Sequence, residues 1–311
     1  RLQARWAIVG IIAMLVSARL PLSLIRKLAL PFFALTLILL AAVLIPGIGE
    51  EVQGARRWIN LGGLTIQPSE LVKLSFMLYL ATWLEKRQKI WPFLFISTVI
   101  LGLVMAQPDL GTSVVVLTTG IIMYFISGAP LMILGLTTAA GILGTVGLIM
   151  LSPYRLKRLQ TFFDPTIDPL GSSYHIRQIL LALGSGGWLG VGIGRSRQKY
   201  QYLPEAATDS IFAVMAEEIG FLGAAAIILL FVILIYRGFA IARRAPTAYT
   251  QLLAGGLTAW IGVQIFINLA SMVALVPLTG VPLPFISYGG SSLVTVLTAV
   301  GLLVNISRLR T

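Results

Sequence analysis

The chain has 311 residues, of which 57% are hydrophobic and 11% charged, and its net charge is +12. Soluble domains carry about 25% charged residues, so this composition excludes an ordinary soluble protein and predicts a polytopic membrane protein. The sequence has no cysteine and a single histidine, which excludes disulfides, thiol nucleophiles and zinc sites built from His or Cys. We expect this residue, His175, to be solvated in a polar loop. No basic face or motif for nucleic acid is visible.

Nine apolar runs approach the roughly 20 residues that a membrane-spanning helix needs. They lie at 6–18, 28–46, 67–84, 92–107, 112–127, 131–151, 210–236, 250–275 and 289–306. The sequence therefore predicts an all-α polytopic membrane protein with one membrane domain, 1–311. The first, fourth and fifth runs are short, so their ends are the least well defined.

Basic residues decide the orientation of these spans. Lys and Arg cluster near 19–27, 86–89, 237–244 and 308–310. With nine spans, all four clusters fall on one side, which the positive-inside rule makes cytoplasmic. The first residue is then outside and the last inside. A membrane protein without a visible signal peptide more often starts in the cytoplasm, so we expect a tenth span before residue 1.

The same count places three polar regions outside, at 47–66, 152–209 and 276–288. The large outer loop, 152–209, is long for a helix connection, and such loops are usually functional. It also breaks the positive-inside rule with Arg155, Lys157, Arg158, Arg177, Arg195, Arg197 and Lys199. An anionic ligand on the outer side would explain this excess of positive charge.

Two outer segments contain many backbone-breaking residues. Gly184–Gly194 could hold a phosphate with its backbone amides, or could make tight turns at the membrane surface. Region 276–292 has three prolines and three glycines, which are incompatible with a regular helix through most of it. Irregular backbone at membrane depth is tolerated where it lines a polar cavity.

Asp209 is the strongest candidate for chemistry, because it lies where the large outer loop enters a membrane helix. Its alternative role is capping that helix. Residues at helical spacing below it are all small: Ala213, Ala216, Gly220 and Gly223. They could allow close helix packing or form a groove for a lipid chain. Glu217 and Glu218 lie on other faces of the helix, and we expect them near its cytoplasmic half, paired with basic residues of neighbouring helices.

Other polar residues on the outer side could have a structural role or bind the substrate. Lys73 could pair with Glu70, three residues earlier on the same helix face, or could direct its charge at a phosphate. Arg56, Arg57 and Arg195 are alternative phosphate ligands. We expect Asp109 to cap the helix that follows it rather than to act in catalysis.

These segments together resemble the SEDS family of bacterial cell-wall glycan polymerases. The matching elements, in family order, are Gly54–Trp58, Gln67–Leu71 with Lys73, Gln107–Gly111, Tyr202–Glu205 with Thr208 and Asp209, Glu217–Gly220 and Pro282–Ser292. The stretch Arg195–Glu205 is more similar to the division branch than to the elongation branch. One departure is Ala207–Ser210, where family members often have His-Thr-Asp-Phe. The family fold has ten spans with both termini in the cytoplasm.

The resemblance implies a reaction at the outer face of the bacterial cytoplasmic membrane. Lipid II, a disaccharide-pentapeptide on undecaprenyl pyrophosphate, donates its glycan to a growing β-1,4 strand. The family's catalytic aspartate corresponds to Asp209, and a single displacement with inversion suffices because the donor linkage is α. The acceptor hydroxyl needs a base, and the pyrophosphate needs cations or a divalent metal, Mg or Mn. Lys73, Arg57, Arg195, Glu205 and Ser291 are the candidate substrate-binding residues.

The family resemblance also implies partners and leaves two other classes of function open. We expect a class B penicillin-binding protein, whose transpeptidase cross-links the new glycan, together with other division proteins and membrane lipids at the septum. The first alternative is a lipid II transporter, which broken helices and buried charges would suit. The second is a scaffold that only holds division partners. Asp209 and the basic loop lie at one surface, which favours the enzyme.

Overall fold

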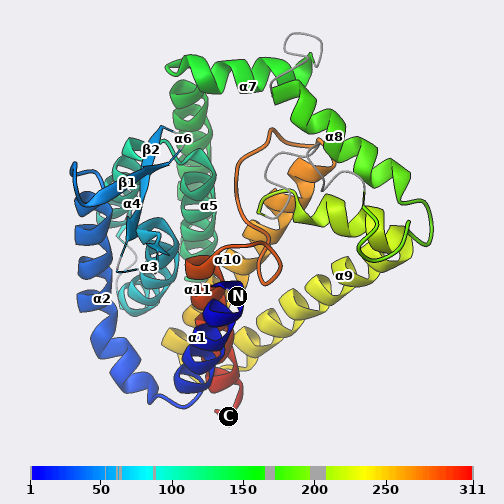
Figure 1. Cartoon of the computed structure of the whole chain (residues 1–311). Helices are drawn as coiled ribbons and strands as arrows, with labels where there is room; N and C mark the ends of the chain where they lie inside the picture. Colours follow the sequence, from blue (N-terminus) through cyan, green and yellow to red (C-terminus); the bar gives the residue numbers. More distant parts are fainter. Residues whose placement is uncertain are drawn as a thin grey trace. The chain divides into compact units, whose positions relative to one another are not determined.

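The computed structural model describes residues 2–52, 54–60, 62, 65–86, 89–164, 172–196 and 208–309 (Figure 1). Within them lie eleven helices and one three-stranded sheet. The chain divides into two compact units. The first comprises residues 1–139, 235–263 and 289–311, and the second comprises 140–234 and 264–288. The single membrane domain predicted from the sequence stays a prediction.

Nine of the described helices coincide with the nine predicted spans. They are α1 Leu2–Ser17, α2 Leu22–Ala42, α3 Pro68–Leu84, α4 Ile90–Ala106, α5 Leu110–Ile126, α6 Leu131–Met150, α9 Ile211–Arg244, α10 Ala248–Met272 and α11 Gly290–Ser307. By length and composition, α2, α6, α9, α10 and α11 can cross a membrane, and α1, α4 and α5 are shorter apolar helices. The predicted fold class, a polytopic helical membrane protein, is confirmed.

The polar regions contain secondary structure that the sequence did not predict. The large outer loop forms α7 Pro153–Phe163 and α8 Ser172–Ser185. The region 47–66 forms an antiparallel sheet of β1 Gly49–Val52, β2 Ala55–Asn60 and β3 Thr65–Ile66, in the order β1-β2-β3. These strands are too short for a clear alternation of polar and apolar residues, which is the main sequence signal for a strand.

In the first unit, α1 and α11 lie side by side and run in the same direction (Figure 1). Trp6 packs on Gly290 near the start of both helices, and Asn305 donates hydrogen bonds to the carbonyls of Ser17 and Leu20 near the end of both. The first and ninth of nine alternating spans must run in the same direction. This pairing therefore agrees with the predicted succession of spans.

Contacts at one end of the first unit join three of the loops predicted to be cytoplasmic. Arg26, at the start of α2, forms an ion pair with Glu85 at the end of α3. The Arg26 guanidinium also lies 5.3 Å from the ring centroid of Tyr249, at the start of α10. Arg308, after α11, donates to the carbonyl of Ala18 at 3.4 Å. These contacts confirm that the basic loops of this unit lie at the same end. That this end is cytoplasmic stays a prediction.

In the second unit, α9 is broken at Gly220, which has φ of 71° and ψ of −174° (Figure 1). A helix break leaves carbonyls before it and amides after it without their usual partners. The glycine-rich turn, residues 186–192 after α8, supplies replacements. The amides of Val191 and Gly192 donate to the carbonyls of Glu217 and Glu218, each at 3.0 Å. The amides of Phe221 and Leu222 donate to the carbonyls of Gly187 and Trp188, at 2.8 and 3.2 Å.

We predict that Gly220→Ala destabilises the protein. The backbone conformation at Gly220 is one that other residues adopt at a cost of about 1–3 kcal/mol. An added Cβ would also lie 2.3 Å from the backbone nitrogen of Gly190. The matched control is Gly144→Ala in α6, where no atom lies within 4 Å of the added carbon. The midpoint of thermal unfolding in detergent should fall for Gly220→Ala alone, and an equal midpoint for both variants would contradict this account of the break.

A candidate glycosyl-transfer site around Asp209

Asp209 lies in the turn Thr208–Ser210 that leads into α9, and it is half-buried. The carbonyl of Ser210 accepts from the amides of Ala213 and Val214, at 3.0 and 3.4 Å, and so starts the helix. The carboxylate lies against Gly280, since an added Cβ there would be 3.4 Å from Asp209 Oδ2. The turn before α9 thus presents the acidic side chain to the proline-rich segment, residues 276–288. No helix or strand is found in that segment, as predicted.

Two buried side chains fix the backbone of this turn. Asn268 of α10 donates from Nδ2 to the carbonyl of Asp209 at 3.0 Å and to that of Val281 at 2.8 Å. Ser287 donates to the carbonyl of Thr208 at 2.6 Å and accepts from the amide of Leu283 at 2.8 Å. The end of α10, the proline-rich segment and the entrance to α9 are therefore joined at Asp209. The sequence analysis had missed both residues, because nothing in a sequence shows which main-chain atoms an amide or hydroxyl will reach.

His175 also differs from its predicted role. It is not simply solvated, because its Nε2 lies 2.8 Å from Oγ of the buried Ser210. This contact ties α8 to the residue next to Asp209. Ser210 stands where the family motif often has Phe, so a hydroxyl at this position was the one signal in the sequence that a polar partner lies nearby.

The small residues below Asp209 serve helix packing. Ala213 and Ala216 are buried. A Cβ added to Gly186 would lie 2.3 Å from the Ala216 carbonyl oxygen, so the glycine-rich turn packs directly on this face. The predicted stripe also assumed an unbroken helix, and the break at Gly220 ends its regular spacing. Of the two readings, close packing is therefore the one that the described residues support.

The glycine-rich turn and the two glutamates form one structural unit. The amides of Val191 and Gly192 are bound to α9 carbonyls, as described above, which favours the tight-turn reading over a phosphate cradle. Ser196 donates from Oγ to Glu217 Oε2, and its amide donates to Glu218 Oε1 at 3.3 Å. The described contacts thus join both glutamates to Ser196 of the large outer loop. Their predicted place near the cytoplasmic half, paired with basic residues of neighbouring helices, stays a prediction.

Lys73 forms an ion pair with Glu70, and both are almost fully buried, at 1% and 2% exposure of their side chains. The two nearest atoms, Lys73 Nζ and Glu70 Oε1, are 2.7 Å apart, and Nζ lies 5.8 Å from the ring centroid of Trp260. The ion-pair reading is thus observed. Lys73 belongs to the first unit and Asp209 to the second, so the prediction that they face one cavity stays a prediction.

Three further candidates from the outer side have observed contacts. Arg57 donates to the carbonyls of Gln107 and Pro108, at 2.7 and 2.8 Å, and so fixes the loop before α5. The hydroxyl of Ser291 accepts from the amide of Gln67 at 3.0 Å and donates to the carbonyl of Thr65 at 3.4 Å. Asp109 caps α5 by accepting from the amide of Thr112 at 3.0 Å, as predicted.

The remaining candidates lie in the large outer loop. Arg195 is exposed and lies over Gly192, to whose carbonyl its amide donates at 3.1 Å. Glu205 falls outside the described residues. The substrate-binding roles of Lys73, Arg57, Arg195, Glu205 and Ser291 therefore stay predictions.

Oxygen atoms are the candidate ligands for a divalent cation at Asp209. In the described part of the chain, no group of three His, Asp or Glu side chains could hold a metal. Mg²⁺, however, is commonly held by one or two carboxylates together with substrate phosphates and water. Asp209 is one such carboxylate. The buried oxygens Asn268 Oδ1 and Thr279 Oγ1 have no hydrogen-bond partner among the described residues, so they fit a role as further ligands.

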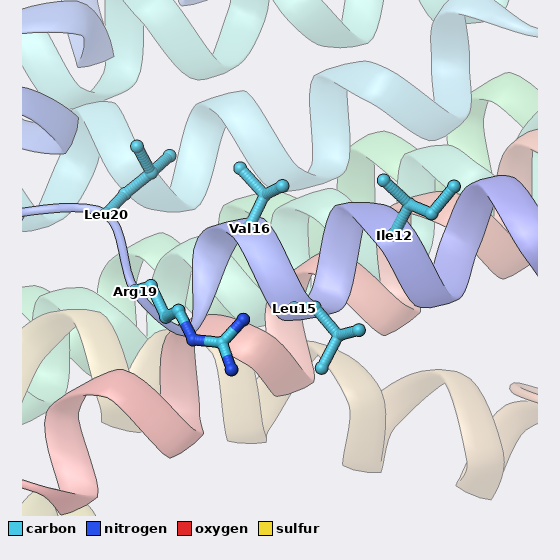
Figure 2. A pocket seen from close by; sticks show the side chains of 5 residues that line it. All are labelled: Ile12, Leu15, Val16, Arg19 and Leu20. Carbon is cyan, nitrogen blue, oxygen red and sulfur yellow. The ribbon is translucent and has the colours of Figure 1, made fainter.

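A shallow hollow on α1 differs from this site in its chemistry. It is lined by Ile12, Leu15, Val16, Arg19 and Leu20 (Figure 2). Figure 2 shows that these side chains all come from α1 and the residues just after it. The lining is apolar apart from Arg19 and offers no carboxylate, so it cannot supply a base.

We predict that Asn268→Leu yields a folded protein with impaired activity. The change removes the donor that fixes the Asp209 and Val281 carbonyls, while the size of the side chain is kept. Small misplacements of catalytic groups can cost on the order of 100-fold in rate. The matched control is Ser271→Ala, which removes a buried hydroxyl bonded to its own helix, at the carbonyl of residue 268. Rates of glycan formation should fall for Asn268→Leu much more than for the control, and equal rates would exclude the positioning role.

We predict that Lys73→Met is strongly destabilising, because it leaves the Glu70 carboxylate buried without its partner. Breaking a buried ion pair typically costs about 3–5 kcal/mol. The double variant Glu70→Gln, Lys73→Met removes both charges and should recover most of the thermal stability. Its activity then separates the two readings of Lys73. An active, stable double variant would assign Lys73 to structure, and an inactive, stable one would support contact with the substrate.

Comparisons with known proteins agree on one family. A family model that is described as a cell cycle protein and covers FtsW, RodA and SpoVE matches residues 2–311. The chain is 45% identical to stage V sporulation protein E of Bacillus subtilis, over 87% of this chain and 76% of that protein. It is 40% identical to a probable peptidoglycan glycosyltransferase FtsW of Trichlorobacter lovleyi, over 98% of this chain and 82% of that protein.

Solved structures show the same fold. A chain from a structure described as the structural coordination of polymerization and crosslinking by a peptidoglycan synthase complex matches with a TM-score of 0.81 and 32% identity. The match covers 98% of this chain and 88% of that one. The rod shape determining protein RodA of Thermus thermophilus matches with a TM-score of 0.72 and 31% identity, over 98% of this chain and 86% of that one.

Proposed function

Because the chain belongs to the FtsW, RodA and SpoVE family of cell cycle proteins, the SEDS family predicted from its motifs, we propose that it is a peptidoglycan glycosyltransferase. It polymerises lipid II into β-1,4 glycan strands at the outer face of the cytoplasmic membrane. The observation that carries this proposal is the carboxylate of Asp209 at the entrance of α9, on a backbone turn that is held by hydrogen bonds. Asn268 bonds the carbonyl of Asp209 and Ser287 that of Thr208, while Gly280 lies against the carboxylate.

Asp209 is the general base of the proposed reaction. A sugar hydroxyl is a poor nucleophile, and a positioned base raises its reactivity by about 10²–10⁴-fold. The hydroxyl attacks the anomeric carbon of the donor, its proton passes to the carboxylate, and the bond to the pyrophosphate breaks. One displacement converts the α linkage of the donor into the β linkage of the polymer. A second carboxylate to act as a nucleophile is therefore not needed.

Positive charge must balance the leaving pyrophosphate. Arg195, Arg57 and Lys73 are the proposed cations, and Glu205 and Ser291 are proposed to bind other parts of the substrate. A bound Mg²⁺ or Mn²⁺ would neutralise developing negative charge on the phosphate oxygens. Asp209 would hold such an ion, with the buried oxygens Asn268 Oδ1 and Thr279 Oγ1 as the proposed further ligands.

The cellular role is proposed to be cell division, with a class B penicillin-binding protein as partner and other division proteins at the septum. Relatives named FtsW support this, at about 40% identity over nearly the whole chain. The similarity to a chain of a peptidoglycan synthase complex supports the partner. The similarity to a stage V sporulation protein and to RodA makes sporulation and elongation the alternative roles.

Lipid II transport is the second candidate function. Two observations favour it: α9 is broken within a predicted membrane span, and α3 carries the buried pair Glu70–Lys73. Broken helices and charges inside the membrane are features of transporters. The break, however, has its backbone groups satisfied by the glycine-rich turn, and the glutamates beside it bind Ser196. The break in α9 therefore has a structural explanation that does not require transport, and this favours the polymerase.

We predict that Asp209→Asn folds and binds its partner but makes no detectable glycan. Asn keeps the size and the hydrogen-bonding ability of the side chain and removes the base, so the loss should be at least about 10²–10⁴-fold. The measurement is glycan length on a gel after purified protein, with its penicillin-binding partner, is incubated with lipid II. The matched control is Asp109→Asn, which keeps the cap of α5 and should retain activity. Near-normal polymerisation by Asp209→Asn would leave Asp209 as a structural residue and place transport first.

A further inference from the structure

The end of α8 and the glycine-rich turn expose an unusual amount of apolar surface for a segment of an outer loop. Trp188, Leu189 and Ile193 are 71%, 79% and 86% exposed. Leu180 and Leu181 at the end of α8 are exposed as well, while Ile176 and Ile179 of the same helix are buried. A helix end that is apolar on both its buried and its exposed side is typical of an apolar environment rather than of water.

This surface is continuous with the apolar surface of α9. The rings of Trp188 and Phe221 are in edge contact, with centroids 5.2 Å apart. The amide of Leu222 donates to the carbonyl of Trp188 at 3.2 Å. Phe221, Leu222, Leu229 and Leu230 are all more than half exposed on α9, a helix that can cross a membrane. The glycine-rich turn must therefore face the same environment, lipid or water, as these side chains of α9.

The depth of Phe221 follows from the sequence. The uncharged run from Phe221 to Tyr236, just before Arg237, rises about 24 Å as a helix. The hydrocarbon core is about 30 Å thick. With Arg237 at the inner boundary, Phe221 lies inside the core, and Trp188 in contact with it lies at or below the outer boundary. Trp is enriched at this level of membrane proteins.

Backbone groups and charges in the loop fit this placement. Bare backbone is costly in lipid, but the carbonyls of Gly187 and Trp188 and the amides of Val191 and Gly192 are all bonded to α9. The exposed basic residues Lys157 and Arg177 lie on α7 and on the first part of α8, and Arg195, also exposed, lies over Gly192 at the end of the turn. Basic residues beside an apolar segment are typical of elements that lie in the headgroup region with apolar side chains in the acyl chains.

We infer that the glycine-rich turn inserts Trp188, Leu189 and Ile193 into the outer leaflet, so that this part of the large outer loop is a lipid-embedded anchor beside the break in α9. The occupant of this surface is phospholipid. The anchor holds the break, and with it the first part of α9 that carries Asp209, at a fixed depth. This inference does not depend on the proposed activity, because it concerns only whether the turn contacts lipid or water.

The absence of cysteine from the sequence makes the test direct, since each introduced cysteine is unique. Spin labels are placed on Leu189→Cys and Ile193→Cys in the full chain, reconstituted in bilayers of phosphatidylethanolamine and phosphatidylglycerol. Their relaxation is measured with oxygen, which partitions into lipid, and with a water-soluble nickel chelate. Lys157→Cys is the water-exposed control, and Leu230→Cys on α9 is the lipid-exposed control. All four native side chains are exposed, so folding should be preserved, and thermal unfolding checks it.

The expected result is an oxygen-to-nickel accessibility ratio at Leu189 and Ile193 that is several-fold higher than at Lys157 and close to that at Leu230. A ratio equal to that at Lys157 would place the turn in water and overturn the inference. Low accessibility to both reagents would mean that protein covers the turn, and this outcome would also overturn it. If either label perturbs the turn, Trp188→Cys provides a third position on the same surface.

Discussion

The four backbone hydrogen bonds between the glycine-rich turn and the break in α9 are the interaction on which the second unit depends. A membrane helix can be interrupted only if another part of the protein satisfies the freed carbonyls and amides. Here the carbonyls of Glu217 and Glu218 and the amides of Phe221 and Leu222 all bond to residues 187–192. Glycine is required where the two backbones approach, because an added Cβ on Gly190 would lie 2.2 Å from the Glu218 carbonyl oxygen. The glutamate side chains then hold Ser196, so the outer loop is fixed to the helix beyond the turn itself.

This break matters for function because it lets the first part of α9 take a direction of its own. Asp209 lies just before that part, and the main-chain carbonyls of Asp209 and Thr208 are bonded by Asn268 and Ser287. His175 adds a third attachment, from α8 to Ser210. The segment is thus held at both ends by elements far away in the sequence. Preorganisation of this kind is what a general base needs, since its effect depends on reaching the acceptor hydroxyl at hydrogen-bond distance.

The spans were predictable because long apolar runs and basic loops are properties of single segments. The nine runs, the cap at Asp109 and the Glu70–Lys73 pair all follow from residues close together in the chain. The break at Gly220 was not predicted, because a lone glycine in an apolar helix usually only lowers stability. The break is stable because a segment some thirty residues earlier supplies its hydrogen-bond partners. Asn268 and His175 were missed for the same reason. The candidate site residue Asp209 was predicted from its place in the sequence and from a motif, whereas the residues that hold the backbone beside it depend on tertiary contacts.

The buried pair Glu70–Lys73 shows how a polar residue can be read in two ways at once. Two charges with about 1–2% exposure are costly to remove from water, and their mutual attraction rarely exceeds that cost. An apolar pair would serve packing equally well. The pair has a further purpose if the predicted contact of Lys73 with an anion holds, because Glu70 Oε1, 2.7 Å from Lys73 Nζ, then orients the ammonium group. Glu70 Oε2 has no hydrogen-bond partner among the described residues. This oxygen can accept a hydrogen bond but repels an anion, so within the pair only Lys73 can meet a phosphate, and the cost of burying both charges is the observation that favours this interpretation.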